Sequence, residues 1–172
     1  MEIIFEEKQK FNQWWLWIIL FIFPLLSIIP FNDESVNIYY IVVGFAIPLL
    51  FYFLELRVFV TTEGLFFQFF PLHFKKQIIK REEIKKFEAL KYNPLVDYGG
   101  WGVKYGLKGK AYNVSGNLGV KIFLKNGTNI LFGSQNHKDF EQALKQMLKI
   151  EKKNRLRKPA LKNKFPELLI QE

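Results

Sequence analysis

Two long stretches without a charged side chain lie near the start of this 172-residue chain, from Phe11 to Asn32 and from Ser35 to Leu54. A helix rises about 1.5 Å per residue, so about 20 apolar residues span the roughly 30 Å hydrocarbon core of a bilayer. Each stretch therefore predicts a transmembrane helix, over about 12–31 and 36–55, and residues 11–55 together predict a transmembrane hairpin.

The basic residues predict the orientation of that hairpin. The connector 30–35 carries no Lys or Arg, whereas the flank 1–10 carries Lys8 and Lys10, and the chain beyond Leu56 carries all the others. Segments rich in Lys and Arg stay in the cytoplasm. We therefore expect a cytosolic N-terminal flank and both termini in the cytoplasm.

From Leu56 onward, apolar residues recur with a period of two, which predicts strands. A short turn joins Leu56–Thr61 to Leu65–Phe70, and Gly64 can take a positive φ there. Asn126-Gly127 joins two later strands and is typical of a two-residue type I′ turn, which needs positive φ at both positions. About seven strands over residues 56–151 are spaced as in a small barrel or sandwich.

A helix is expected to follow the strands. Asn136 is a suitable N-cap, and Asp139 suits the positive end of a helix. Apolar residues then recur at helical spacing, which predicts one buried stripe that covers the open end of the sheet. The stripe consists of Phe140, Ala143, Leu144, Met147 and Leu148. Residues 152–172 begin with a run of basic residues and are expected to form a solvated tail.

This order of parts, with Val60–Leu65 and the blocks Tyr98–Gly102 and Ala111–Val120, resembles a family of two-helix bacterial membrane proteins with a pleckstrin-homology-like cytosolic domain. The resemblance implies an α+β membrane protein in the bacterial inner membrane. Its transmembrane hairpin would precede a seven-stranded pleckstrin-homology-like barrel or sandwich capped by a C-terminal helix. The resemblance implies no function, because one fold hosts many functions. Lipid-binding relatives of that fold carry bases at the first hairpin, where this chain has Glu63.

The block from Tyr98 to Gly102 is the first candidate site. Its glycines free the backbone to take positive φ while a large aromatic side chain projects. The loop could therefore bind a partner through Trp101, or it could be a tight turn whose Trp fills the end of the barrel. The candidate partner-binding residues are Tyr98, Gly99, Gly100, Trp101 and Gly102.

A run of basic residues is the second candidate site. It could contact acidic lipid headgroups or an acidic partner, or it could be an ordinary solvated face. It consists of Lys75, Lys76, Lys80, Arg81, Lys85 and Lys86.

Composition argues against most chemistry. The chain has no cysteine and only two histidines, His73 and His137. We find no phosphate-binding or dinucleotide-binding glycine pattern, and we expect no catalytic residue, metal, cofactor, nucleic acid or small-molecule substrate. The interpretation is a non-enzymatic scaffold or accessory subunit on the membrane that docks a protein partner or a second copy. Sensing of anionic lipid by the basic surface, or an enzyme acting on a membrane-bound substrate, are the alternatives.

Overall fold

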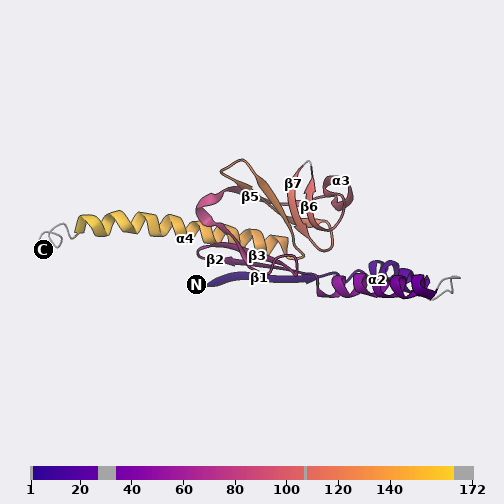
Figure 1. Ribbon diagram of the computed structural model, residues 1–172. Coiled ribbons are helices and arrows are strands. Elements are labelled where there is room, and N and C mark those ends of the chain that lie inside the picture. Colours follow the sequence, from indigo (N-terminus) through magenta and orange to yellow (C-terminus); the bar gives the residue numbers. More distant parts are fainter. Residues whose placement is uncertain (1, 27–33, 107, 165–172) are drawn as a thin grey trace, which may run out of the picture.

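The computed structural model describes residues 2–26, 34–106 and 108–164, and it describes the side chains of these residues except 23, 34–40 and 151–164. They form an α+β fold with two sheets (Figure 1). The first sheet has the order β1-β2-β3-β4, formed by Ile3–Lys10, Glu55–Thr61, Gly64–Phe70 and Gln77–Lys80. The second has the order β5-β8-β9-β7-β6, formed by Ile84–Lys91, Leu118–Leu124, Asn129–Gly133, Gly109–Asn113 and Gly102–Gly106. The helices are α1 (Trp14–Leu26), α2 (Glu34–Phe53), α3 (Pro94–Tyr98) and α4 (His137–Lys164), and a 3₁₀ turn covers Arg81–Glu83.

The first sheet is antiparallel, and the two helices α1 and α2 interrupt it. The chain leaves the sheet at Lys10 and returns at Glu55, and these two residues are partners in the β1–β2 register. The turn from β2 to β3 requires a glycine at position 64 because the backbone there lies close to β4, and not because the residue has a positive φ. A Cβ on Gly64 would lie 2.5 Å from the carbonyl oxygen of Ile79 on β4. The expected positive φ at this glycine is therefore wrong.

The second sheet is antiparallel except where β7 pairs with β9 in parallel. The turn between β8 and β9 differs from the expected type I′ turn, because Gly127 has a positive φ and Asn126 does not. Gly127 N donates to the carbonyl of Leu124 (3.1 Å), and Leu124 N donates to the carbonyl of Thr128 (2.8 Å). This pattern is a three-residue loop with a left-handed glycine. The Asn126 side chain accepts from Thr128 N (3.0 Å) and so stabilises the alternative turn.

The main core lies between the sheets, where the first part of α4 packs. α4 contacts β1 and β2 of the first sheet and β5 and β8 of the second (Figure 1). The predicted apolar stripe is confirmed, because Phe140, Leu144 and Met147 are fully buried and Ala143 is nearly so. The Phe140 ring stacks on Phe5 of β1, with centroids 5.2 Å apart. Thus α4 joins the two sheets instead of covering one end of a single barrel.

The expected seven-stranded pleckstrin-homology-like barrel or sandwich is wrong. The described residues contain nine strands in two separate sheets. One added strand is β1, which lies in the flank that was expected to precede the fold. Its inward positions include the polar residues Glu7 and Gln9, both buried, so the strand lacks the apolar alternation that identifies a half-buried strand.

The predicted transmembrane hairpin is also wrong. Among the residues that the structure describes, no helix is both long and apolar enough to cross a membrane. α1 has 13 residues, which at about 1.5 Å per residue reach about 20 Å. α2 begins with Glu34, Ser35 and Asn37, so its uninterrupted apolar part starts only at Ile38. The inner-membrane localisation and the orientation with both termini in the cytoplasm depended on this hairpin and are corrected with it. Residues 27–33 of the expected spans lie outside the described residues.

Candidate functional site: an apolar arm beside the glycine-rich loop

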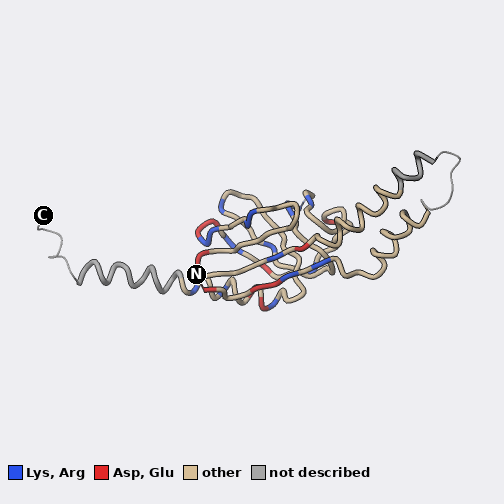
Figure 2. Tube along the Cα trace, turned by 60° about the horizontal axis from the view of Figure 1, so that its bottom comes forward, with Lys and Arg blue, Asp and Glu red and all other residues tan. Residues whose placement is uncertain are grey.

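The helices α1 and α2 form an apolar arm that projects beyond the end of the first sheet (Figure 1). Many of its large apolar side chains are exposed, among them Trp14 at 74% and Val42 at 62%. Figure 2 shows many charged residues on the sheets, while none lies among the residues of the arm whose side chains the structure describes. Monomeric proteins rarely expose an apolar surface of this extent, and larger patches mark interaction sites.

The arm is fixed to the body at its base. Trp17 Nε1 donates to the carbonyl of Phe11 (2.8 Å), and the Phe11 ring meets Phe51 of α2 edge-on at 5.2 Å. Farther out, the two helices approach closely, because a Cβ on Gly44 would lie 3.1 Å from the Cα of Pro24. The arm is therefore held by packing and hydrogen bonds, and its exposed side chains have a defined arrangement.

The glycine-rich loop follows α3 and is shaped by its own backbone. Asn93 caps α3, with its side-chain oxygen accepting from two backbone N–H groups of the first turn (3.2 Å each). Gly99 ends the helix with φ +72°. Tyr98 is only 6% exposed and packs edge-on against Tyr92 at 5.9 Å. Tyr98 is thus a core residue of the second sheet's outer face, and the structure does not present it to a partner.

Trp101 is the residue of this loop that reaches the arm. Its indole lies 5.7 Å from that of Trp15 on α1, and its Nε1 donates to the carbonyl of Gly116 (3.0 Å). Gly100 is buried, Gly99 is exposed, and Gly102 N donates to the Asn113 side chain (2.9 Å). The loop is therefore a hydrogen-bonded turn that brings one aromatic residue to the base of the arm.

The predicted basic patch is divided between the two sheets. Lys76 Nζ lies 4.7 Å from the ring centroid of Phe59 on β2, whereas Lys86 Nζ lies 4.3 Å from that of Phe123 on β8. Between them, the Arg81 guanidinium donates to a backbone carbonyl in the β2–β3 turn (2.9 Å). The remaining members are exposed: Lys75, Lys80 and Lys85. Lys76 and Lys86 thus contact rings of different sheets, and a binding role of the patch stays a prediction.

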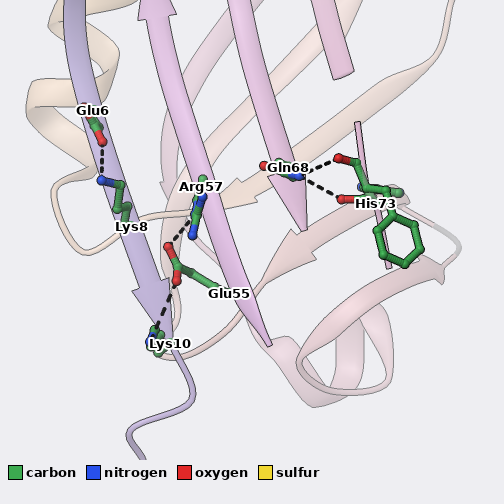
Figure 3. A network of polar contacts seen from close by, with 8 residues as sticks. Glu6, Lys8, Lys10, Glu55, Arg57, Gln68 and His73 are labelled. Atoms are coloured by element: carbon green, nitrogen blue, oxygen red, sulfur yellow. Dashed lines mark hydrogen bonds and ion pairs between the residues drawn. The ribbon is translucent and has the colours of Figure 1, made fainter. Parts of the chain in front are cut away.

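Cations on the outward face of the first sheet are paired with carboxylates (Figure 3). Lys8 Nζ lies 2.8 Å from Glu6 Oε1, and Arg57 Nε donates to Glu55 Oε1 at 2.6 Å. Lys10 Nζ lies 3.8 Å from the second oxygen of Glu55, close to the base of the arm. The three cations next to the arm therefore share two carboxylates, and the apolar surface of the arm remains the dominant feature.

Side chains that could suggest catalysis are engaged in structural contacts. The Ser134 hydroxyl donates to Glu7 Oε2 (2.6 Å). Lys108 Nζ lies 2.7 Å from Asp97 Oδ1, and this hydrogen bond, with a second from Asn93 N, lowers the pKa of Asp97. Within the described parts of the chain, no three His, Asp or Glu residues are grouped so that they could hold a metal ion.

Tyr92 lies beneath the glycine-rich loop and links it to β7. Its hydroxyl accepts from Asn113 Nδ2 (3.1 Å). Burial raises the pKa of Tyr92 to about 12, because the phenolate would lose its hydration. The side chain is therefore a neutral structural group under ordinary conditions.

The raised pKa of Tyr92 makes the stability of the fold sensitive to alkali. The unfolded chain ionises a tyrosine near its ordinary pKa of about 10, so the stabilising contribution is complete below pH 10 and is lost between about pH 10 and 12. We expect wild type to lose about 2–3 kcal/mol more than Tyr92→Phe over that range. Urea unfolding at pH 9 to 11.5 measures the difference, and equal pH slopes in the two proteins would contradict it.

Two features of the structure had no counterpart in the sequence interpretation. Glu7 and Gln9 connect β1 to the end of β9, since Gln9 Nε2 donates to the carbonyl of Gly133 (2.8 Å). Lys110 on β7 points between the sheets, on the same face as the buried Tyr112. The spacing of Lys110 two residues before Tyr112 within a strand was the available signal, because alternate residues of a strand share a face.

The sequence matches no protein-family model, and no curated protein matches it. The arm and its surroundings are therefore interpreted from their own geometry.

Proposed function

We propose that this chain is a non-enzymatic accessory subunit that docks through its α1–α2 arm into a helical protein assembly. The observation that carries the proposal is the exposed, uncharged apolar surface of the arm. Fully burying one large apolar side chain stabilises a complex by about 1.5–3 kcal/mol, so a few such residues suffice for a specific interaction.

The distribution of exposed residues around α2 indicates what kind of partner would fit. Val42, Val43 and Phe45 are all exposed, and so is Ile47. Successive helix positions are about 100° apart, so these side chains point to several sides of the helix. A partner that covered one side would leave the others in water. The proposed partner therefore surrounds the arm with apolar, uncharged helices of its own.

The base of the arm has the features of an interface rim. Trp15 is 38% exposed beside the half-buried Trp101. Near them, Asn12 presents a polar side chain, and Gly116 presents exposed backbone. Aromatic residues are enriched in protein interfaces, where an apolar centre is bordered by polar groups. Trp101 would thus contact the partner where the arm enters it, which retains part of the role expected for the glycine-rich loop.

A photo-crosslinking experiment tests this proposal in the full chain. A photoreactive phenylalanine analogue replaces Phe45 on the arm or, as the matched control, Val96 on α3, which is 80% exposed but lies on the body. After irradiation of cells that express these variants, we expect the variant with the analogue at position 45 to form an adduct of one defined mass. The variant with the analogue at position 96 should form none. Adducts at both positions, or at neither, would contradict the proposal.

A second experiment removes the apolar character of the arm. Val42→Asp with Leu49→Asp places two charges on exposed positions, so the fold is preserved while the burial of the arm becomes costly. We expect the crosslinked complex to fall at least tenfold, with Val96→Asp unchanged. Binding of the wild-type chain to protein-free zwitterionic vesicles, abolished by the same two substitutions, would identify lipid instead and overturn the proposal.

A further inference from the structure

Lys110 occupies an unusual position in the second sheet. It pairs with Tyr105 on β6 and with Ile130 on β9, in a row of residues that faces the first sheet. Two residues later, Tyr112 on the same face is buried and stacks on Phe132, with centroids 5.5 Å apart. An inward-facing position of this kind normally holds an apolar residue, so a lysine here needs a physical reason.

The ammonium of Lys110 lies between two aromatic rings and lacks a countercharge. Its Nζ is 4.8 Å from the ring centroids of both Tyr105 and Tyr112. No carboxylate of the described residues lies within ion-pair distance of it, in contrast to Lys108, whose Nζ is 2.7 Å from Asp97. The rings attract the cation but leave its charge unneutralised.

The protonation state of Lys110 is set by the same neighbours. Burial alone would lower the pKa of Lys110, but interactions with the hydroxyls of Tyr105 and Tyr112 outweigh it and raise the pKa above its ordinary value. The side chain therefore remains an ammonium. A protonated lysine is a poor nucleophile, which argues for a binding role over a covalent one.

Lys110 lines an open groove of about 480 Å³. Its wall is partly apolar, formed by the rings and side chains of Tyr105 and Ile130, and Tyr105 is 77% exposed. Glycine backbone at Gly106 and Gly109 lines the other part. A groove with one unpaired cation and an apolar wall complements a small molecule with an anionic head.

His73 lies behind the groove, in the loop between β3 and β4. Gln68 fixes this loop by donating to the carbonyls of His73 and Phe74 (3.0 Å each; Figure 3). The His73 ring is 5.6 Å from that of Tyr112, and its Nδ1 is buried with no hydrogen-bond partner. Burial and the nearby Lys110 charge lower the pKa of His73. His73 therefore adds no second positive charge beside Lys110 at neutral pH.

We propose that this groove binds a small oxyanion, a carboxylate or a phosphate, on the Lys110 ammonium, with the apolar part of the ligand against Tyr105 and Ile130. The site is independent of the α1–α2 arm, because none of its lining residues belongs to α1 or α2.

Calorimetric titration of the full chain tests the proposal, with benzoate and inorganic phosphate as separate probes. Lys110→Met removes the charge and keeps the length of the side chain. Lys104→Met, on the neighbouring strand β6 but on the opposite face of the sheet, is the matched control. We expect both probes to bind wild type and Lys104→Met equally, and to bind Lys110→Met at least tenfold more weakly. Absence of binding of both probes to wild type, or an equal loss in the two variants, would overturn the proposal.

A third variant distinguishes the contribution of the apolar wall to binding from that of the Lys110 charge. It also keeps the proposal testable if Lys110→Met does not fold. Tyr105→Ala truncates an exposed side chain, so the core is not disturbed. We expect it to weaken benzoate more than phosphate, because both probes lose the ring beside the Lys110 ammonium but only benzoate loses an apolar contact. Unchanged benzoate affinity would contradict the placement of the ligand against Tyr105.

Discussion

Phe140→Ala is expected to destabilise the protein by about 3–5 kcal/mol, the usual cost of deleting a buried aromatic ring. Phe140 is fully buried between the two sheets. Its ring stacks on Phe5 of the first sheet (5.2 Å, 2° between planes) and meets Phe132 of the second edge-on at 6.4 Å. Removing it would leave a cavity and would also remove the aromatic contact that joins the sheets.

Urea unfolding followed by tryptophan fluorescence measures this effect. Gln142→Ala on the exposed side of α4 is the control, and we expect it to change the free energy of unfolding by less than about 0.5 kcal/mol. If Phe140→Ala unfolded only the second sheet and left the first cooperative, α4 would not be the common core of both sheets. A loss below about 1 kcal/mol would contradict the packing described here.

The parts of the fold that the sequence predicted are those with a local signal. Alternation in Leu56–Thr61 and Leu65–Phe70 placed β2 and β3 within a residue of their ends. The stripe from Phe140 to Met147 placed the start and the buried face of α4 correctly, because its period of 3.6 is unambiguous. The helix continues to Lys164, through the first part of the expected tail. Each of these segments buries one apolar face, so the periodicity of its apolar residues matches the side that is buried in the fold.

The parts that failed depend on partners distant in the chain. The strand β1 pairs with β2 across the whole arm. The inward Glu7 carboxylate and Gln9 Nε2 of β1 find hydrogen-bond partners more than a hundred positions away. No local pattern could encode that. The register of β7 against β9 is also non-local, and it places Lys110 beside Ile130.

The two apolar stretches show a different limit of sequence reasoning. A long uncharged run shows that a helix avoids water, but it is the same signal whether lipid or protein covers the helix. The structure describes a helix over Trp14–Leu26 of the first run and places both helices at the end of a sheet. In the glycine-rich loop, Trp101 contacts the arm, whereas the side chain of Tyr98 is buried in the core.

Glu7→Ala is expected to cost about 2–4 kcal/mol, because hydrogen bonds to a carboxylate contribute about 1.5–3 kcal/mol each. Glu7 is 7% exposed on the inward face of β1. Its two oxygens accept from the Ser134 hydroxyl (2.6 Å) and from Gln135 N (2.8 Å), in the segment between β9 and α4. Alanine would leave the buried Ser134 hydroxyl without this acceptor and would remove the contact with Gln135 N, which weakens the attachment of β1 to the second sheet.

The neighbouring Glu6→Ala is the matched control for this prediction. Glu6 lies on the opposite face of the same strand and pairs with the exposed Lys8, so we expect a loss below about 0.5 kcal/mol. Glu7→Gln keeps one acceptor but turns an amide N–H toward a donor, and should fall between the two. Urea unfolding gives the free energies, and limited proteolysis reports whether residues before Lys10 become cleavable in Glu7→Ala. If Glu7→Ala and Glu6→Ala lowered the free energy of unfolding equally, the hydrogen bonds of Glu7 would not be what holds β1 to the second sheet.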